Sequence, residues 1–241
     1  MYEPRTYRYW LESKDLVFSN VVVKETDLYL RASSNLKGKA RRLVLKYRRQ
    51  LESYIERSPA FLTSLEPVIV ADDAPTIVSE MAVAARQANV GPMAAVAGAI
   101  AEFVGSELLA YSPEIIVENG GDIYLKSLKK RIIGIYAGKS PLSEKLGLEI
   151  EGADTPLGIC TSSGTVGHSF SFGKADAVVV LAQSAILADA AATAIGNLIQ
   201  QPDDIMKGIE LAKNIGGLRG AVLIKNDTIG IWGEIKICQL R

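Results

Sequence analysis

The sequence predicts a mixed α+β fold, and three observations support this prediction. Strand-like segments gather near both ends and in the middle of the chain. They do not alternate regularly with helices, which argues against a βαβ series. Short turn signals join several of these segments as hairpins. Two alanine-rich segments with few charges have the composition of central, largely buried helices.

Length and composition predict one domain spanning residues 1–241. The chain is 48% hydrophobic, which supports a sizeable core. It contains 27 Lys+Arg and 27 Asp+Glu residues, so no global positive field attracts nucleic acid, and nucleic-acid binding is not expected. The two cysteines, Cys160 and Cys238, are far apart and form neither a disulfide framework nor a zinc spacing. Oligomeric state does not follow from these features.

The N-terminal segment MYEPRTYRYW is polar and aromatic, without the apolar centre of a secretion signal and without a lipidation motif. The longest apolar run, Met93 to Ala101, is too short to cross a bilayer. We therefore expect a cytoplasmic protein with no membrane segment.

The first quarter of the chain predicts strands followed by one long helix. Apolar and polar residues alternate over 7–11, and the segments 17–23 and 28–30 flank a polar turn, which is a hairpin pattern. Residues 37–57 carry apolar side chains at helical spacing. Seven cations and no acid lie between Lys37 and Arg49. A solvated helix face is the favoured interpretation, and the alternative is a patch for an acidic partner such as nucleic acid or a nucleotide phosphate.

The middle of the chain predicts two helices and then strands. Residues 68–70 suit a short strand or an extended segment. Asp72 and Asp73 precede Pro75, which suggests a helix N-cap with an early proline. We expect the first helix to end near Ala88 and a second, after Gly91-Pro92, to reach about Tyr111. The expected strands of this part cover 115–117, 123–125 and 132–137.

The last third predicts strands that enclose two further helices. The expected strands are 146–150, 157–160, 175–181, 221–225, 228–232 and 235–238. The expected helices run from the Gln183-Ser184 turn to about Leu198, and from Pro202 to about Asn214.

The loop from Thr161 to Gly173 is the first candidate for a binding site. It is rich in glycines and hydroxyl side chains, which can present backbone N–H groups and hydroxyls to an anion such as a phosphate. His168, the only histidine, lies in its middle, and Asp176 stands at the entrance of the following strand. An ordinary exposed turn is the alternative. The length of the loop and the buried strand after it favour the binding interpretation.

The second candidate is the alanine-rich helix that follows. Asp189 and Thr193 are four residues apart and share one helix face. A carboxylate and a hydroxyl in an apolar setting can supply oxygen ligands to a hard cation such as Mg²⁺. Asp189 as a helix N-cap is an equally supported alternative from the residues alone. The turn at Asn119, Gly120, Gly121 and Asp122 is most simply the tip of a hairpin.

Three segments together resemble the ApbE family of flavin transferases, which move FMN from FAD to a threonine or serine of a target protein. Asn119-Gly120-Gly121-Asp122 is similar to the family's N-x-G-G-D turn. Thr161-Ser162-Ser163-Gly164, followed by His168, is similar to its T-S-G…H segment. Ala188 to Thr193 is similar to its A-D-A-x-x-T helix. The resemblance covers roughly residues 70–235.

The resemblance implies a T-fold-like, mostly antiparallel α/β domain that binds FAD, with Mg²⁺ as cofactor and a protein as FMN acceptor. It assigns the metal to Asp189 and Thr193, and so decides between ligand and cap. It places 119–122 and 161–164 beside the flavin nucleotide and His168 near the chemistry. His168 or Asp176 is the candidate base for the attacking hydroxyl.

One position and one segment differ from the family's pattern. Ala97 stands before Gly98 where the family usually has a lysine, and the residues after His168 replace its H-x-x-D-P-x-x-G segment. The sequence therefore leaves two functions open. One is a Mg²⁺-dependent flavin transferase, and the other is a nucleotide-binding or flavin-binding module that kept the fold without the chemistry.

Overall fold

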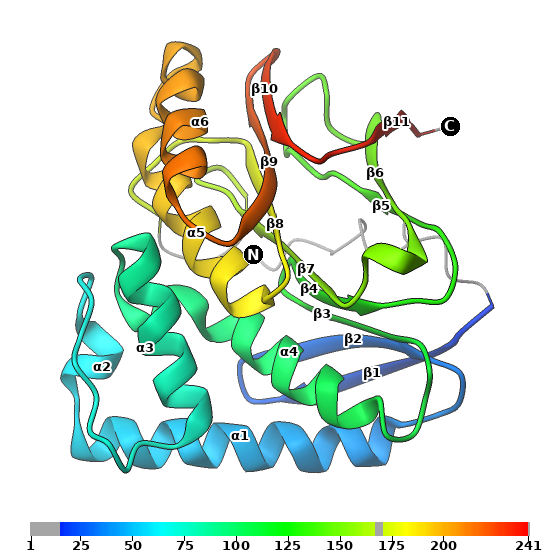
Figure 1. Ribbon diagram of the computed structural model, residues 1–241, viewed down its shortest axis with the longest axis vertical. Coiled ribbons are helices and arrows are strands. Elements are labelled where there is room, and N and C mark those ends of the chain that lie inside the picture. Colours follow the sequence, from blue (N-terminus) through cyan, green and yellow to red (C-terminus); the bar gives the residue numbers. More distant parts are fainter. Residues whose placement is uncertain (1–14, 167–170, 241) are drawn as a thin grey trace.

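The computed structural model describes residues 15–166 and 171–240. An eight-stranded sheet forms the centre, the helices cover one of its faces, and a three-stranded sheet packs against the other face (Figure 1). The large sheet has the order β1-β2-β3-β4-β7-β8-β9-β10, and the small one β11-β6-β5. Every strand pair within the described residues is antiparallel. The predicted mixed, mostly antiparallel fold is thus confirmed.

The strands follow the apolar segments expected from the sequence. Their bounds are β1 Val17–Val23, β2 Thr26–Ala32, β3 Ile115–Asn119, β4 Asp122–Lys126, β5 Arg131–Gly134, β6 Leu146–Ile150, β7 Leu157–Ser162, β8 Ala177–Ala182, β9 Leu218–Lys225, β10 Thr228–Gly233 and β11 Ile237–Gln239. β8 is buried along its whole length, because helices lie on one of its faces and the small sheet on the other. This explains its unbroken apolar run.

The helices bury their apolar faces against the large sheet and against one another. Their bounds are α1 Lys37–Arg57, α2 Ala60–Thr63, α3 Thr76–Ala88, α4 Val96–Leu108, α5 Ala185–Leu198 and α6 Ile205–Asn214, with the short 3₁₀ turns η2 Pro92–Ala95, η3 Gly152–Asp154 and η4 Pro202–Asp204. Alanine and glycine dominate the buried positions of α4 and α5, so the two helices approach closely. A Cβ atom on Gly98 of α4 would lie only 2.3 Å from the Ala185 carbonyl oxygen of α5.

Two hydrophobic clusters lie on opposite faces of the large sheet. The larger one joins the helices to side chains such as Val117, Val178 and Val180, and the smaller one lies beneath the three-stranded sheet. Both α4 and β8, whose apolar segments the sequence marks as buried, contribute to the core: Ile100 and Val104 are at most 2% exposed, and Val178 and Val180 are 0% exposed. Neighbouring residues of a strand point to opposite faces, so Leu157 and Ile159 of β7 pack in the smaller cluster and Cys160 packs in the larger one.

Residues 68–70, for which the sequence left a short strand or an extended segment open, form no strand. Two local predictions were wrong. The N-cap of α3 is Pro75, with no side-chain cap from the preceding acids Asp72 and Asp73. The strand predicted over 132–137 ends at Gly134. The strand pattern over 7–11 lies outside the described residues.

Within 15–166 and 171–240, no single helix is long and apolar enough to cross a membrane. The pair formed by α3 and the segment Pro92–Leu108 meets the length and composition test only jointly, across a bend of 104°.

Candidate functional site

The tip of the β3–β4 hairpin forms one wall of the candidate site. Asn119 and Asp122 pair across the turn, and Gly120 and Gly121 take φ angles of +71° and +107°, which glycine adopts without strain. The Gly121 N–H donates to Glu118 Oε1 at 2.7 Å. The hairpin-tip interpretation is therefore confirmed, and it places the two polar residues of the turn side by side.

The second wall is α5, which lies lengthwise on β7. A Cβ atom on Gly158, in β7, would lie 2.3 Å from Ala185 Cα at the start of α5. Near its end, a Cβ atom on Gly196 would lie 3.3 Å from Ser162 Oγ. Because helix and strand run alongside each other between these contacts, Asp189 and Thr193 lie over the Cys160–Ser162 part of β7. The structure thus brings the Asp189 face of α5 to the start of the 161–166 loop.

The N-terminus of α4 meets the carboxylate of Asp189. The Gly98 backbone N–H donates to Asp189 Oδ2 at 2.8 Å, and the Asn119 side chain donates from Nδ2 to the Ala97 carbonyl oxygen at 3.1 Å. The first N–H groups of a helix have no partner within the helix and lie at the positive end of its dipole, so they suit an anion. The start of α4 is consequently held between the β3–β4 hairpin and α5.

Asp189 does not cap its own helix. Ser184 is the N-cap of α5, and its hydroxyl accepts from the Leu187 N–H while it donates to Glu102 Oε2 at 2.9 Å. The cap interpretation of Asp189 was therefore wrong, since Asp189 lies in the interior of α5. Its carboxylate is available for another role.

Two buried carboxyl groups, those of Asp122 and Asp189, lie close enough for the charge of one to act on the other. Burial raises the pKa of Asp189 to about 7, although the Gly98 and Ala97 N–H groups act in the opposite direction. Burial also raises the pKa of Asp122, and the negative charge of Asp189 adds to this effect. The Thr161 N–H donates to Asp122 Oδ1 at 3.2 Å. The same two acids, together with burial, raise the pKa of the Cys160 thiol, so this cysteine stays protonated.

The loop after β7 begins beside these acids. Ser163 Oγ accepts from the N–H groups of Thr165 and Val166, at 3.2 and 3.0 Å, and forms a tight turn. The Gly164 N–H donates to the Ala175 carbonyl oxygen. A Cβ atom on Gly164 would lie 2.0 Å from the Gly173 carbonyl oxygen, so the two arms of the loop touch at their backbones. The side chains of Thr161, Ser162 and Ser163 are half-buried.

Asp176 lies at the base of this loop and has two hydrogen-bond partners. Thr165 Oγ1 donates to Asp176 Oδ1 at 2.9 Å, and the Asn226 N–H donates to Oδ2 at 2.6 Å. Lys225 Nζ is 3.8 Å from Oδ1. Asp176 therefore ties the loop to the β9–β10 turn, and its predicted role as a base stays a prediction. His168 lies outside the described residues, so its placement near the ligand also stays a prediction.

The donor set around Asp189 suits a hard cation. No ion pair joins Asp122 or Asp189 to a Lys or Arg side chain in the part of the chain that the structure describes. That part also contains no group of three or more His, Cys, Asp or Glu residues placed to hold a metal. Mg²⁺ typically binds through one or two carboxylates and completes its shell with water and substrate phosphates. Asp189, with Thr193 one turn away, fits that pattern.

Sequence reasoning did not assign a site role to Gly98, to Cys160 or to Glu102. Glu102 is half-buried on α4, and desolvation raises the pKa of its carboxyl group. Its Oε2 accepts from the Ser184 hydroxyl and from the Ile186 N–H at 3.1 Å, so it clamps α4 to the start of α5. The only signal for Gly98 was a glycine inside a helical pattern, which often marks a close approach of two backbones.

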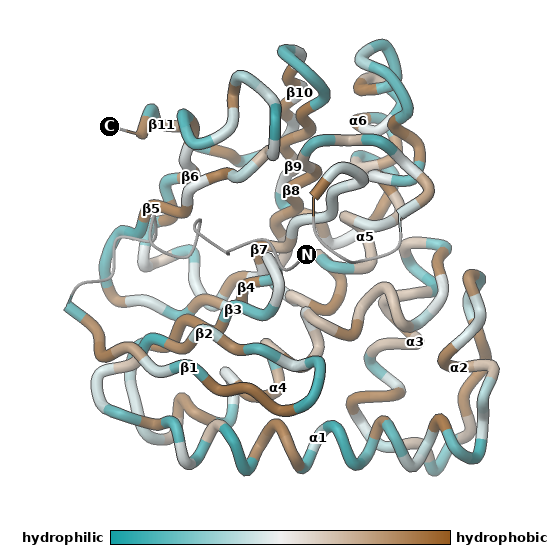
Figure 2. The backbone as a smooth tube through the Cα atoms, turned by 180° about the vertical axis from the view of Figure 1, so that it is seen from behind, coloured by the Kyte–Doolittle hydropathy of each residue, from teal (hydrophilic) through white to brown (hydrophobic). Residues whose placement is uncertain are grey.

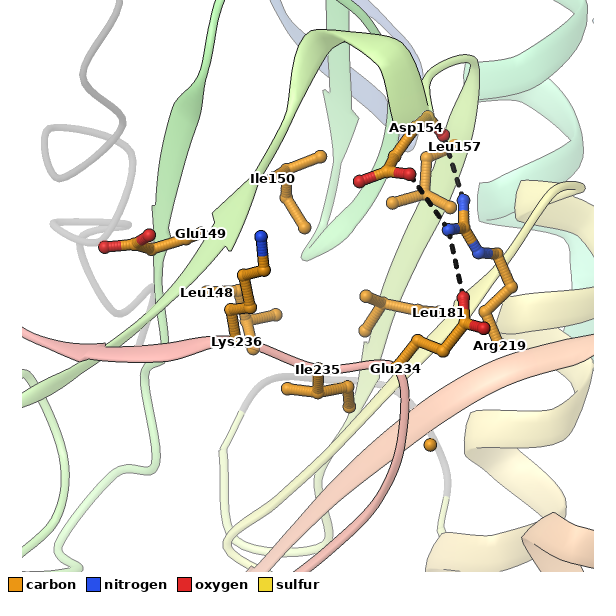
Figure 3. A pocket seen from close by; sticks show the side chains of 11 residues that line it. Leu148, Glu149, Ile150, Asp154, Leu157, Leu181, Arg219, Glu234, Ile235 and Lys236 are labelled. Atoms are coloured by element: carbon orange, nitrogen blue, oxygen red, sulfur yellow. Dashed lines mark hydrogen bonds and ion pairs between the residues drawn. The ribbon is translucent and has the colours of Figure 1, made fainter.

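A separate cavity of about 330 Å³ lies on the other face of the large sheet, next to the small sheet. Figure 3 shows an apolar floor that includes Leu148 and Leu181, and a charged rim where Arg219 pairs with Asp154 and Glu234. The cavity contains none of the candidate residues.

Comparison with known proteins identifies a family and solved structures with this fold. A family model described as "AbpE bacteria" matches residues 8–214, and the chain therefore belongs to that family. A UPF0280 protein of Methanocaldococcus jannaschii is 48% identical over 223 residues, covering 89% of this chain and 90% of the relative. A UPF0280 protein of Methanopyrus kandleri is 44% identical over 229 residues and covers 92% of each chain.

Solved structures with the same fold are flavin transferases. The apo form of Pseudomonas stutzeri flavinyl transferase ApbE has a TM-score of 0.58 at 15% identity, covering 90% of this chain and 93% of that one. Flavin transferase ApbE from Vibrio cholerae has a TM-score of 0.52 at 15% identity, with 90% and 96% covered. At these identities the likeness shows the fold, and the resemblance inferred from the motifs is confirmed by the family match.

Proposed function

We propose that this chain binds a flavin nucleotide together with Mg²⁺ and transfers FMN from FAD to a hydroxyl group of an acceptor protein. The observation that carries the proposal is the buried pair of carboxyl groups, Asp122 and Asp189, at the N-terminus of α4. Burying carboxylates without a cation is costly, so a site that keeps two of them needs a reason other than stability. Family membership supports flavin chemistry as that reason.

Each wall of the site has a defined task in this proposal. Asp189 and Thr193 hold the cation, and the hydroxyls and N–H groups of 161–164 bind the diphosphate of the nucleotide. The Asn119–Asp122 turn lines the flavin nucleotide, and Asn119 also fixes the first turn of α4 through Ala97. A bound Mg²⁺ would offset negative charge that develops on the departing AMP.

The transfer itself balances as a phosphoryl substitution. The acceptor hydroxyl oxygen forms a bond to the phosphorus on the flavin side of the diphosphate. The bond between that phosphorus and the bridging oxygen breaks, and AMP leaves with the bridging oxygen. A base takes the proton of the hydroxyl, and His168 is the candidate, with Asp176 second.

The alternative is a flavin-binding module without transfer activity. Ala97 favours the binding module, because the family usually has a lysine at this position and an alanine side chain carries no charge. The two functions share the binding site and differ only in the release of AMP.

Purified protein mixed with FAD, with and without Mg²⁺, tests the proposal. Binding is followed by the visible absorption of flavin retained after gel filtration, and chemistry is followed by chromatography of released AMP. We expect Mg²⁺-dependent flavin retention that Asp189→Asn and Thr193→Ala abolish and the exposed control Asp72→Asn preserves. Retention without AMP release in the presence of protein acceptors would support the binding module. No retention under any condition would refute both functions.

A further inference from the structure

The basic N-terminal half of α1 is the feature of the sequence that the flavin site does not use. Three of its seven cations have partners within the molecule. Lys46 Nζ is 2.6 Å from Glu107 Oε1, Arg48 pairs with Glu25 and Glu52, and the Lys39 ammonium lies 3.8 Å from the centroid of the Tyr111 ring.

The other four cations are Lys37, Arg41, Arg42 and Arg49. All four are exposed, and none lies within ion-pair distance of an acid in residues 15–166 and 171–240. At about 100° per residue, these four side chains fall within an arc of about 140° around α1. The opposite side packs into the core through Ala40, Val44, Tyr47, Leu51 and Tyr54.

A half-buried leucine lies at the centre of this charged side. Leu45 is three or four residues from Arg41, Arg42 and Arg49, so it neighbours all three on the helix surface. Unlike Leu43 and Ile55 of the same helix, it does not belong to the side chains packed against either hydrophobic cluster. We call Lys37, Arg41, Arg42, Leu45 and Arg49 the α1 patch.

The helix itself gains nothing from these charges. Lys37 and Lys39 lie in the first turn, where the helix dipole favours acids, and that turn contains none. Arg42 is four residues from Lys46 and three from Lys39, and like charges at these spacings repel. Local stability therefore does not explain the cations, and a site that breaks local rules is typically functional. α1 also lies along the outer edge of the molecule, where Figure 2 shows alternating hydrophilic and hydrophobic bands.

We infer that the α1 patch is a docking surface for an acidic segment of a partner protein. Arginines around an apolar centre are the composition of protein–protein contact sites, and carboxylates complement the guanidinium groups in charge and shape. A nucleic acid fits less well, since the formal net charge is zero and the sequence pI is about 6.6, whereas nucleic-acid-binding domains are typically strongly basic. This inference concerns a surface outside the flavin site and does not depend on flavin binding.

The test uses a fluorescein-labelled twelve-residue peptide, (Glu-Glu-Leu-Glu)₃, and its partner (Glu-Glu-Gly-Glu)₃ of equal charge, with binding followed by fluorescence anisotropy. We expect saturable binding that weakens with added salt and is tighter for the leucine peptide. Arg41→Glu with Arg42→Glu should weaken it by about tenfold or more. Far-UV circular dichroism and thermal unfolding confirm that the double variant is folded, and Arg41→Gln with Arg42→Gln provides a milder second variant.

The matched control is Lys207→Glu with Lys213→Glu, which changes the net charge equally on α6, away from the patch. This control should bind the leucine peptide like the unaltered chain. Equal loss in both double variants would show that only net charge matters and would overturn the inference. It would also be overturned by an absence of saturable binding, by equal affinity for both peptides, or by tighter binding to a DNA oligonucleotide or to vesicles of anionic phospholipid.

Discussion

Replacing Asp189 by asparagine tests the physical basis of the candidate site without reference to flavin. The folded-state pKa of Asp189 is about 7, raised from 3.8 mainly by burial. Between pH 3.8 and about 7, the Asp189 carboxyl group is ionised in the unfolded chain and protonated in the folded chain. The unfolded state therefore binds fewer protons, and the free energy of unfolding falls as pH rises from about 4 to about 7. Above about pH 7, the free energy of unfolding no longer changes through Asp189, because the group is ionised in both states.

The size of the effect follows from the shift of about 3 units. At 1.36 kcal/mol per unit, ionising Asp189 in the folded, metal-free protein costs on the order of 4 kcal/mol at pH 8. Asparagine removes this cost and keeps one oxygen to accept from the Gly98 N–H. Its amide N–H₂ cannot accept from the second backbone donor, at Ala97, which costs about 1–2 kcal/mol at every pH.

We therefore expect the two unfolding curves to cross. In the presence of a chelator, Asp189→Asn should be less stable than the unaltered chain at pH 4 and about 2–3 kcal/mol more stable at pH 8. Urea unfolding across this pH range, followed by circular dichroism, measures the difference. Asp72→Asn, on an exposed side chain, should follow the unaltered chain throughout.

Added Mg²⁺ extends the same experiment. A cation that binds the carboxylate should raise the stability of the unaltered chain at pH 8 and leave Asp189→Asn unchanged, because a ligand that binds only the folded state stabilises it. If Asp189→Asn lowers stability by the same amount at pH 4 and pH 8 in chelator, the buried-carboxylate reasoning is refuted. If Mg²⁺ then stabilises both proteins equally, Asp189 is not its ligand.

Three further predictions concern the packing of α4, the N-cap of α5 and the role of His168. Gly98→Ala should lower the free energy of unfolding by about 1–3 kcal/mol, because the new Cβ would lie 2.3 Å from a backbone oxygen. Gly38→Ala, with open space around it, should raise the free energy of unfolding by about 0.5–1 kcal/mol. Urea unfolding compares the two variants. Ser184→Ala removes the N-cap of α5 and a donor to Glu102, and should cost about 1–2 kcal/mol in the same assay. His168→Ala should abolish AMP release while flavin retention persists, and unchanged values in both assays would exclude His168 from the site.

The sequence predicts the elements of the site better than their contacts. The amphipathic pattern of 37–57 predicts α1 with the bounds that the structure shows, because its buried positions repeat at helical spacing. The Asn119–Asp122 turn is also correct, since a two-residue glycine turn between apolar segments has few alternatives. In both cases the information is local in the chain.

What the sequence does not reveal is long-range. The hydrogen bond from the Gly98 N–H to Asp189 joins residues 91 positions apart, and no local pattern predicts that the start of α4 points at the middle of α5. The error at Asp72 and Asp73 has a similar origin: cap statistics favour these acids, but the helix begins only after Pro75. The close approach of glycine and alanine surfaces decides such contacts, and small residues leave little trace in a hydrophobic pattern.

The placement of Asp122 and Asp189 argues for a ligand more strongly than any single motif. Most buried positions in α5 are alanine, and burying an ionisable group in such a setting is costly unless it is hydrogen-bonded or paired. This core keeps both acids, and the donors around them are the Gly98, Ala97 and Thr161 N–H groups and the Cys160 thiol. Under the proposed function, a bound cation would offset the cost of ionising these two carboxyl groups. Because both pKa values are raised, ionising these acids without a cation is costly, and this cost is the structural basis for proposing a cation-bound nucleotide here.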